Sequence, residues 1–322
     1  MLAARALTSS PEDPIQALGL VDVPIPLPDS GWTRVQVKAA GLNHHDVWTL
    51  RGVGISPERL PITLGCEASG IDDTGREVIV HGVIADPAAG GGDETLDPGR
   101  SLLSEVHDGT FAEYVVVPSR NVIAKPSGIS FEEAACLPVA WLTAFRMLTT
   151  VGKLMPGETL LVQGSAGGVA SAAIALGRAM GLRVWATSRS EDKRAFALSL
   201  GAHAVFEPGA RLPHRVDAVI ETVGEATWSH SMKSLRPGGR IIISGATTGS
   251  MPPADLSRLF FLQLQVLGST MGTVGELSSL VSFLEGTGLR PTIDRVVPLS
   301  DAASAINAMA KGDVMGKIVL TP

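Results

Sequence analysis

The chain has 322 residues, enough for about two domains, and 45% of them are hydrophobic, so a sizeable core is expected and disorder is not. The net charge is −6 and no run of five or six like charges occurs, which argues against binding to nucleic acid or to a membrane surface. Two cysteines exclude a disulfide framework. Neither a signal peptide nor an apolar run of about 18 residues is found, so we expect a soluble, cytoplasmic protein.

Residues 1–124 are predicted to form mostly β structure. Polar and apolar residues alternate over residues 33–37, which is typical of a half-buried strand. Further strands are predicted at 77–80 and 112–117. The glycines, prolines and acids of residues 84–99 indicate a surface loop.

From residue 125 onward, strands and helices alternate. A helix is predicted over 131–148 in spite of Pro138. The predicted strands after it are 159–163, 183–187, 204–206, 216–220 and 240–244, and the helices between them are 169–180, 191–200 and 227–235. This alternation indicates βαβ units and a parallel sheet. Beyond residue 266, we expect helices at 274–284 and 302–309 and strands at 295–297 and 317–320.

A glycine-rich turn, residues 164–170, joins the strand at 159–163 to the following helix, and this placement is typical of dinucleotide binding. Gly167 lets the backbone approach a pyrophosphate, and the free N–H groups of the helix attract its charge. The best register departs from G-x-G-x-x-G by having serine at the first position, while alanine at the third is tolerated. The predicted contacts are Ser165, Ala166, Gly167, Gly168 and Val169.

The end of the second strand of this unit indicates which cofactor binds. An acid at this place would select NAD by binding the ribose hydroxyl, but the acid is missing. Ser188, Arg189 and Lys193 would instead give a 2′-phosphate charge-assisted partners, which predicts NADPH. The alternative is that Arg189 is only a solvated surface residue.

A hydrolytic interpretation of the same turn also exists. Residues 163–167 nearly match the G-x-S-x-G nucleophile elbow, which also lies between a strand and a helix. The first glycine of that motif is missing, and the second-strand signal would be left unexplained.

Eight segments, taken together and in this order, carry a family resemblance: 40–46, 64–70, 109–114, 142–144, the turn at 164–170, 200–202, 236–240 and 316–320. The chain resembles the medium-chain dehydrogenase/reductase superfamily, in particular its zinc-free quinone oxidoreductase branch. The resemblance implies an α/β protein with a GroES-like β domain, residues 1–124 and 266–322, and a Rossmann domain, residues 125–265, whose doubly wound parallel sheet binds NADPH. It also implies a homodimer formed through the Rossmann sheet.

The zinc enzymes of this superfamily bind catalytic metal with a cysteine, a histidine and a second cysteine or acid. In this sequence, the positions of these three ligands are taken by Asn43, Cys66 and a residue near Val139. The lobe at 84–107 lacks the four cysteines of a structural zinc site. We therefore expect no metal. A rearranged site is the alternative, since several side chains nearby are of ligand types: His44, His45, Asp46, Cys66 and Glu67. Adjacent histidines on an extended segment could not easily share one ion. Cys66 could also be a small buried hydrophobe, and Asp46 a structural hydrogen-bond partner.

The resemblance further implies hydride transfer to a quinone or an α,β-unsaturated carbonyl. Asn43 or an imidazole would polarise the acceptor, and His45 stands at the position of a proton relay. Trp48 would wall the substrate site or belong to the core. The implied cofactor contacts are His44, Thr143 and Lys317, together with Val223, Gly224, Gly245 and Ala246 at strand ends. Either histidine could instead be an exposed loop residue.

The function predicted from the sequence is thus metal-free, NADPH-dependent reduction of a quinone or enone. Two alternatives stay open at this point. One is a zinc-type alcohol dehydrogenase with a rearranged site, and the other is a cofactor-binding protein with little turnover. The only tyrosine, Tyr114, lies in a predicted β segment, so a tyrosine acid is not expected.

Overall fold

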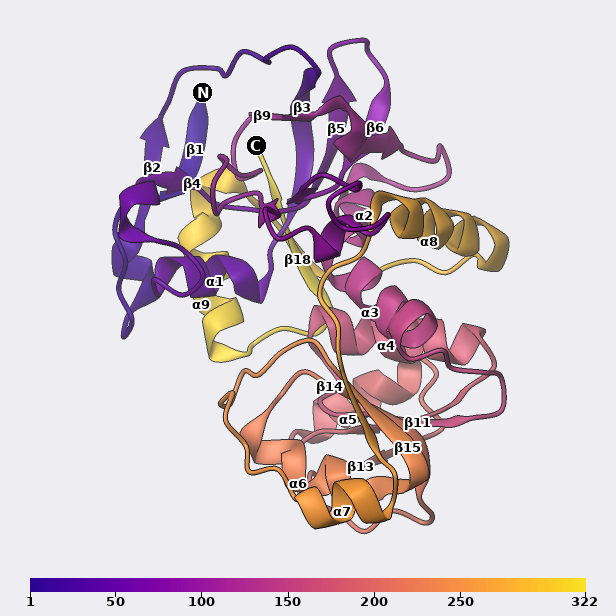
Figure 1. The fold of residues 1–322 in the computed structure, drawn as a ribbon. Coiled ribbons are helices and arrows are strands. Elements are labelled where there is room, and N and C mark those ends of the chain that lie inside the picture. The colour runs from indigo at the N-terminus through magenta and orange to yellow at the C-terminus, as the bar shows by residue number, and fades with distance from the viewer. The chain divides into compact units, whose positions relative to one another are not determined.

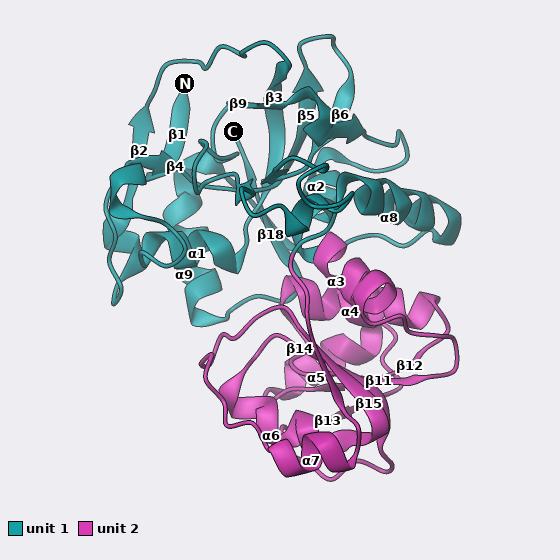
Figure 2. Cartoon of the chain, in the orientation of Figure 1, with its two compact units in different colours: residues 1–140, 271–322 teal, residues 141–270 magenta.

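The computed structural model describes residues 1–322, and its elements fall into two units (Figures 1 and 2). Unit 1 comprises residues 1–140 and 271–322, and unit 2 comprises residues 141–270. Both boundaries lie later in the chain than the sequence predicted. The first differs because residues 131–139 are bonded to unit 1: the Ser69 hydroxyl donates to the Phe131 carbonyl, and the Val139 N–H donates to Glu67.

Unit 1 is built on a seven-stranded, mainly antiparallel sheet in the order β10-β6-β5-β3-β18-β17, with β9 also paired to β3. Only β17 and β18 run parallel. The strands are β3 (Trp32–Gly41), β5 (Ala68–Asp72), β6 (Glu77–Val80), β9 (Tyr114–Pro118), β10 (Val122–Ala124), β17 (Ile293–Pro298) and β18 (Lys317–Thr321). The predicted alternation at 33–37 is confirmed as part of β3, where Val35 and Val37 are buried.

Two small sheets complete the β structure of unit 1. One has the order β2-β1-β4, with β1 (Leu2–Ala6), β2 (Leu18–Asp22) and β4 (Ile62–Thr63), and the other pairs β7 (Val83–Ile84) with β8 (Ser101–Leu102). The sequence analysis did not predict β1, because three of its five residues are alanine, which is a poor strand former. Register with β2 and burial of its alanines override that local preference.

The helices of unit 1 are α1 (His44–Leu50), α2 (Phe131–Ala135), α8 (Val274–Thr287) and α9 (Ala302–Lys311). Helices α8 and α9 confirm the prediction. Helix α1 corrects it, because the segment around His44 was taken as extended. Asn43 is the N-terminal cap of α1 and forms a capping box with Asp46, which satisfies N–H groups at the start of the helix.

Unit 2 is a six-stranded sheet in the order β13-β12-β11-β14-β15-β16, and every neighbouring pair is parallel. Its strands are β11 (Thr159–Val162), β12 (Arg183–Thr187), β13 (Ala204–Phe206), β14 (Val216–Glu221), β15 (Leu235–Ile243) and β16 (Gln265–Gly268), and its helices are α3 (Leu142–Arg146), α4 (Gly168–Ala179), α5 (Glu191–Ser199), α6 (Glu225–Ser234) and α7 (Leu256–Phe261). The predicted βαβ units are confirmed, and the chain order reverses between β11 and β14, the switch point where such sheets bind ligands.

The predicted helix at 131–148 is broken into shorter pieces. Between α2 and α3 the chain forms a π turn at 137–141, and a second π turn, 147–151, follows α3. Pro138 lacks the N–H that an unbroken α-helix needs there, so the chain widens its turn instead of stopping. No helix of the structure is long and apolar enough to cross a membrane.

Candidate cofactor and catalytic sites

The glycine-rich turn of unit 2 lies between β11 and α4, as the sequence predicted. Gly164 has a φ of 81°, a left-handed conformation that favours glycine, and Gly167 caps the N-terminus of α4 without a side-chain hydrogen bond. A Cβ placed on Gly167 would meet no atom within 4 Å, so the space beside it is open to a ligand. The contacts predicted for this turn stay a prediction.

Ser165 is turned into the protein. Its hydroxyl donates to the Lys193 carbonyl at 2.9 Å, and its exposed fraction is 3%. A nucleophile elbow presents its serine to solvent beside a base. The hydrolytic interpretation of this turn is therefore not supported.

The end of β12 presents backbone and positive charge rather than an acid. Arg189 is exposed and Ser188 is partly exposed. The Arg194 guanidinium donates to the carbonyls of both residues, at 2.7 and 3.1 Å, and so fixes the segment. Glu191 and Asp192 occupy the first turn of α5, as expected.

A buried polar network lies beneath the turn, and the sequence analysis missed it. The Gln163 amide donates to Ser231 at 3.0 Å and accepts from Thr187 at 2.7 Å, and the Thr187 hydroxyl in turn accepts from the Gly164 N–H at 3.3 Å. Ser231 donates to Glu221 at 2.6 Å. The network ties the ends of β11, β12 and β14 together, which holds the turn in place.

Glu221 binds two of the backbone N–H groups that were predicted to contact the cofactor after β14. Its carboxylate accepts from the N–H groups of Val223 and Gly224, at 2.8 and 3.1 Å, so both donors are already hydrogen-bonded inside the protein. Gly224 has a φ of 95°, and a Cβ there would clash with the Gly249 carbonyl oxygen. Only glycine fits. The remaining predicted contacts lie at Gly245 and Ala246, which are partly exposed, and at Thr143, which is buried in α3.

In unit 1, Asn43, Glu67 and Lys317 form a buried cluster. The Lys317 ammonium donates to the Leu42 carbonyl, to Asn43 Oδ1 and to Glu67 Oε1, each at 2.7 Å. The Glu67 and Lys317 side chains are 0% and 2% exposed. Burial lowers the pKa of Lys317, but the Glu67 carboxylate, together with Cys136 and Cys66, raises it by more, so the net pKa is raised and the ammonium stays charged.

This cluster corrects two predicted roles. An ammonium has three donors, and all three of Lys317 are bonded inside the protein, which leaves none for a cofactor. The Asn43 amide donates to Glu67 at 2.8 Å and to the Gly41 carbonyl at 3.2 Å, so it is not a free donor for an acceptor carbonyl. The sequence analysis considered Glu67 only as a possible metal ligand. It could not predict the ion pair with Lys317, because the two residues lie 250 positions apart in the chain.

Helix α1 separates the two adjacent histidines. Successive helical residues point about 100° apart, and His44 is exposed while the His45 side chain is 19% exposed. His45 Nε2 lies 3.1 Å from Ser104 Oγ. Trp48 is partly buried, and the Arg51 guanidinium lies 5.6 Å from its ring centre, so it is not a fully buried core residue, and its role as a wall of the substrate site stays a prediction.

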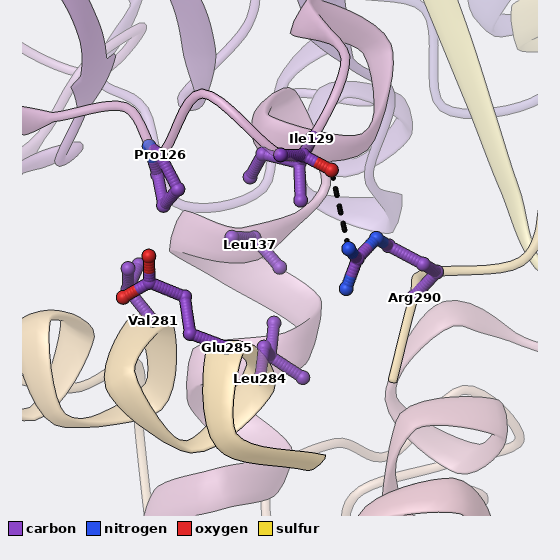
Figure 3. Close-up of a pocket in the computed structure, with 8 residues that line it drawn as sticks. Pro126, Ile129, Leu137, Val281, Leu284, Glu285 and Arg290 are labelled. Atoms are coloured by element: carbon purple, nitrogen blue, oxygen red, sulfur yellow. Dashed lines mark hydrogen bonds between the residues drawn. The ribbon is translucent and has the colours of Figure 1, made fainter. Parts of the chain in front are cut away.

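A pocket in unit 1 lies between α8 and the segment before α2 (Figure 3). The Arg290 guanidinium borders it and donates to the Gly128 carbonyl at 3.1 Å. Its volume is about 40 Å³, whereas small-molecule sites occupy roughly 300–1,000 Å³. The pocket is therefore too small for a nucleotide or a quinone. Its lining is Pro126, Gly128, Ile129, Leu137, Val281, Leu284, Glu285 and Arg290.

Known proteins resemble this chain over its whole length. Residues 29–127 match the alcohol dehydrogenase GroES-like domain, and residues 168–286 match the zinc-binding dehydrogenase family. A solved structure of an NAD-dependent alcohol dehydrogenase is 34% identical over all of both chains, with a TM-score of 0.92. The chain belongs to the medium-chain dehydrogenase/reductase superfamily. It is an oxidoreductase of that superfamily.

Two curated relatives of this dehydrogenase/reductase carry other activities in their names. A crotonyl-CoA carboxylase/reductase of Cereibacter sphaeroides is 29% identical over 92% of this chain and 81% of its own length. A quinone oxidoreductase of Homo sapiens is 26% identical over 93% of this chain and 92% of its own length. The relatives therefore include an alcohol dehydrogenase, a quinone oxidoreductase and a crotonyl-CoA carboxylase/reductase.

The residues of this dehydrogenase/reductase do not fit a catalytic zinc ion. Cys66 is fully buried, its Sγ lies 4.0 Å from the Asn43 amide nitrogen, and burial raises the pKa of its thiol. The Asp46 carboxylate accepts from the N–H groups of Asn43 and Gly65, at 2.8 and 2.9 Å, and burial raises its pKa to about 7. No group of three His, Cys, Asp or Glu side chains is placed to share an ion. The Lys317 ammonium would also repel one.

A buried histidine of this dehydrogenase/reductase gives a prediction about acid stability. His81 is fully buried, neither ring nitrogen has a hydrogen bond, and burial together with the Arg120 charge lowers its pKa to about 3. An unfolded histidine has a pKa of about 6.5, so between these values the unfolded chain binds the extra proton. The stability is therefore complete above pH 6.5 and is lost as the pH falls. We expect His81 alone to cost about 2 kcal/mol between pH 7 and pH 5.

Replacing the ring tests this assignment. His81→Leu should lose about 2 kcal/mol less than the unchanged protein over that pH interval. Urea denaturation at pH 7, 6 and 5 measures the difference, and the other titrating groups cancel between the two proteins. Parallel stability curves would show that His81 does not titrate in this way.

Proposed function

We propose that this protein is an NADPH-dependent oxidoreductase that transfers hydride to a quinone or an α,β-unsaturated carbonyl without a metal ion. The observation that carries the proposal is the Asn43–Glu67–Lys317 cluster, in which Asn43, at the position of a metal ligand, is hydrogen-bonded to an internally neutralised ion pair. Without a Lewis acid, a simple carbonyl lacks polarisation. A conjugated acceptor spreads the developing charge over its own π system.

The cofactor part of the proposal rests on unit 2. The backbone at Gly167 and the free N–H groups at the start of α4 would hold the pyrophosphate. Arg189, with Ser188, would bind the 2′-phosphate at the end of β12. NADPH bound there would supply the hydride.

Two relatives support the acceptor class. Crotonyl-CoA, named in one of them, is an α,β-unsaturated thioester, and the other is named for quinones. The NAD-dependent alcohol dehydrogenase favours the competing assignment. That assignment requires a metal or another polarising group, and Asn43 and Cys66 do not provide one.

Stopped-flow oxidation of NADPH tests the function against quinones, enals and simple aldehydes. We expect turnover of conjugated acceptors, little with simple aldehydes, and less than stoichiometric zinc by metal analysis. Tight NADPH binding without turnover of any acceptor would indicate the cofactor-binding alternative. Stoichiometric zinc with alcohol oxidation would indicate the zinc-type enzyme.

We also propose that the protein is a homodimer that pairs through the free edge of the unit 2 sheet. Strand β16 is the edge strand, and α7 beside it in the chain exposes Phe260 and Phe261 by 70% and 81%. Adjacent apolar surface and an open edge favour a second copy as the partner. Light scattering should give twice the chain mass, and Phe261→Glu should give the monomer. Leu27→Glu, which changes a residue 82% exposed on unit 1, should leave the dimer intact; an unchanged protein that is monomeric would contradict the proposal.

A further inference from the structure

The turn that follows β8 holds an unusual backbone conformation next to His45. Ser104 has a φ of 68°, in the left-handed region that glycine adopts without strain. Its N–H donates to the His107 carbonyl at 2.8 Å, and the Leu102 N–H donates to Glu105 Oε2 at 2.9 Å, so the turn is tightly bonded. Glycine would adopt this backbone conformation with less strain than serine, so the presence of serine indicates that its side chain has a role.

That side chain meets one particular nitrogen of His45. Ser104 Oγ is fully buried and lies 3.1 Å from His45 Nε2, while Nδ1 of the same ring has no hydrogen-bond partner inside the protein. Glu105 Oε1 lies 4.0 Å from Nε2, beyond hydrogen-bond distance, and its side chain is 25% exposed. The hydrogen bond of the ring is therefore made at Nε2, and Nδ1 is left without a partner inside the protein.

We propose that Ser104 and Glu105 are positioning residues that refill His45 with a proton while its Nδ1 protonates the reduced acceptor. The inference rests on the proposed function, because a quinone or enone that takes a hydride must also take a proton. As the Nδ1–H bond breaks toward the developing oxyanion, the Ser104 hydroxyl transfers its proton to Nε2. Ser104 is reprotonated from Glu105 or from water, and the ring then returns to its Nδ1–H form as Nε2 gives its proton back through Ser104 while Nδ1 takes one from solvent. One solvent proton enters, one leaves at Nδ1, and the ring stays neutral.

The lowered pKa of His45 explains why Nε2 must receive a proton when Nδ1 gives one up. Burial alone lowers the pKa of His45 to about 4, so the imidazole is neutral at pH 7 and cannot act as an imidazolium. A neutral ring that lost its only proton would become an imidazolate, which is far too basic to form there. Burial also raises the pKa of Glu105, so that carboxyl holds a proton more readily than usual. On α1, Asp46 is bonded to backbone N–H groups and His44 is exposed, so Glu105 is the acid beside the ring.

The tautomer of His45 tests the arrangement without any substrate. Nitrogen-15 NMR of the histidines in the full chain, with His45 assigned by loss of its signal in His45→Gln, should show Nδ1 protonated and Nε2 as acceptor. In Ser104→Gly this preference should disappear. A ring protonated at Nε2 in the unchanged protein would overturn the inference.

Turnover supplies the second measurement. Ser104→Gly relieves the backbone strain, so it should fold at least as well, yet its kcat should fall about 10- to 100-fold, the low end of what general acid catalysis contributes. Its kcat should also change its pH profile and its solvent isotope effect, while the NADPH dissociation constant stays the same. Lys153→Gly is the matched control, since Lys153 also has a positive φ, 48°, and is remote in sequence from this turn; it should keep full turnover.

The two proposals fail differently. If the unchanged protein reduces no acceptor, the proposed function is wrong, and the NMR result still decides the tautomer. If the unchanged protein turns over and Ser104→Gly keeps its kcat and pH profile, the proton path is wrong while the function stands.

Discussion

Replacing Lys317 with methionine should lower the free energy of unfolding by about 3–5 kcal/mol. Methionine has a similar length and no charge, so the change leaves the Glu67 carboxylate, 0% exposed, without its cation. An uncompensated buried charge is far more costly than the loss of the pair itself. Urea denaturation followed by circular dichroism measures the difference at pH 7.

Two further variants separate this cause from general damage. Lys317→Met combined with Glu67→Gln should recover most of the lost stability, because a neutral amide needs no counterion. Arg34→Met breaks the surface pair with Asp73, whose side chains are 30% and 39% exposed, and should cost about 1 kcal/mol or less. If Lys317→Met costs no more than Arg34→Met, the cluster does not stabilise a buried charge.

The cluster also limits what this part of unit 1 can do chemically. Asn43, the N-terminal cap of α1, is hydrogen-bonded to both Glu67 and Lys317, so the ion pair fixes the start of the helix that carries His45. The double variant therefore separates stability from function. The Lys317→Met, Glu67→Gln double variant should fold stably. In that variant the His45 ring is still positioned by its contact with Ser104.

The sequence predicted the parallel sheet well because its strands are short apolar runs between clear turns. The bounds of β12 and β13 agree with the prediction, and β11 and β14 differ by one residue. Helix α1 escaped prediction because seven residues are too few to show a helical period. The predicted helix at 131–148 was too long, since periodicity does not reveal the π turn at 137–141 that contains Pro138.

The glycine turn was predictable for a different reason than the rest of the site. Its residues are contiguous, so the motif and its strand and helix can be read together. The pairs that define unit 1 are far apart in the chain: 250 residues separate Glu67 from Lys317, and 59 separate His45 from Ser104. Nothing in the local pattern signals such partners. Lys317 was given a cofactor role by the family resemblance alone, and the partners that bind its ammonium, Glu67 and Asn43, lie far away in the sequence.

Cofactor preference should depend on Arg189 more than on any other exposed side chain of unit 2. Arg189→Ala should raise the NADPH dissociation constant about 10- to 100-fold, because a charge-assisted hydrogen bond contributes about 1.5–3 kcal/mol. The NADH constant should hardly change, since NADH lacks the 2′-phosphate. Calorimetric titration of both nucleotides at fixed salt measures the two constants.

Arg183→Ala is the matched control, because Arg183 is an exposed arginine at the opposite end of the same strand, β12. It should leave both constants unchanged. Ser188→Asp should act in the opposite sense by placing an acid where a ribose hydroxyl would be bound, which favours NADH and repels the phosphate. Equal weakening of both nucleotides by Arg189→Ala would mean that the guanidinium contacts a part common to both, and the preference for NADPH would then lose its physical basis.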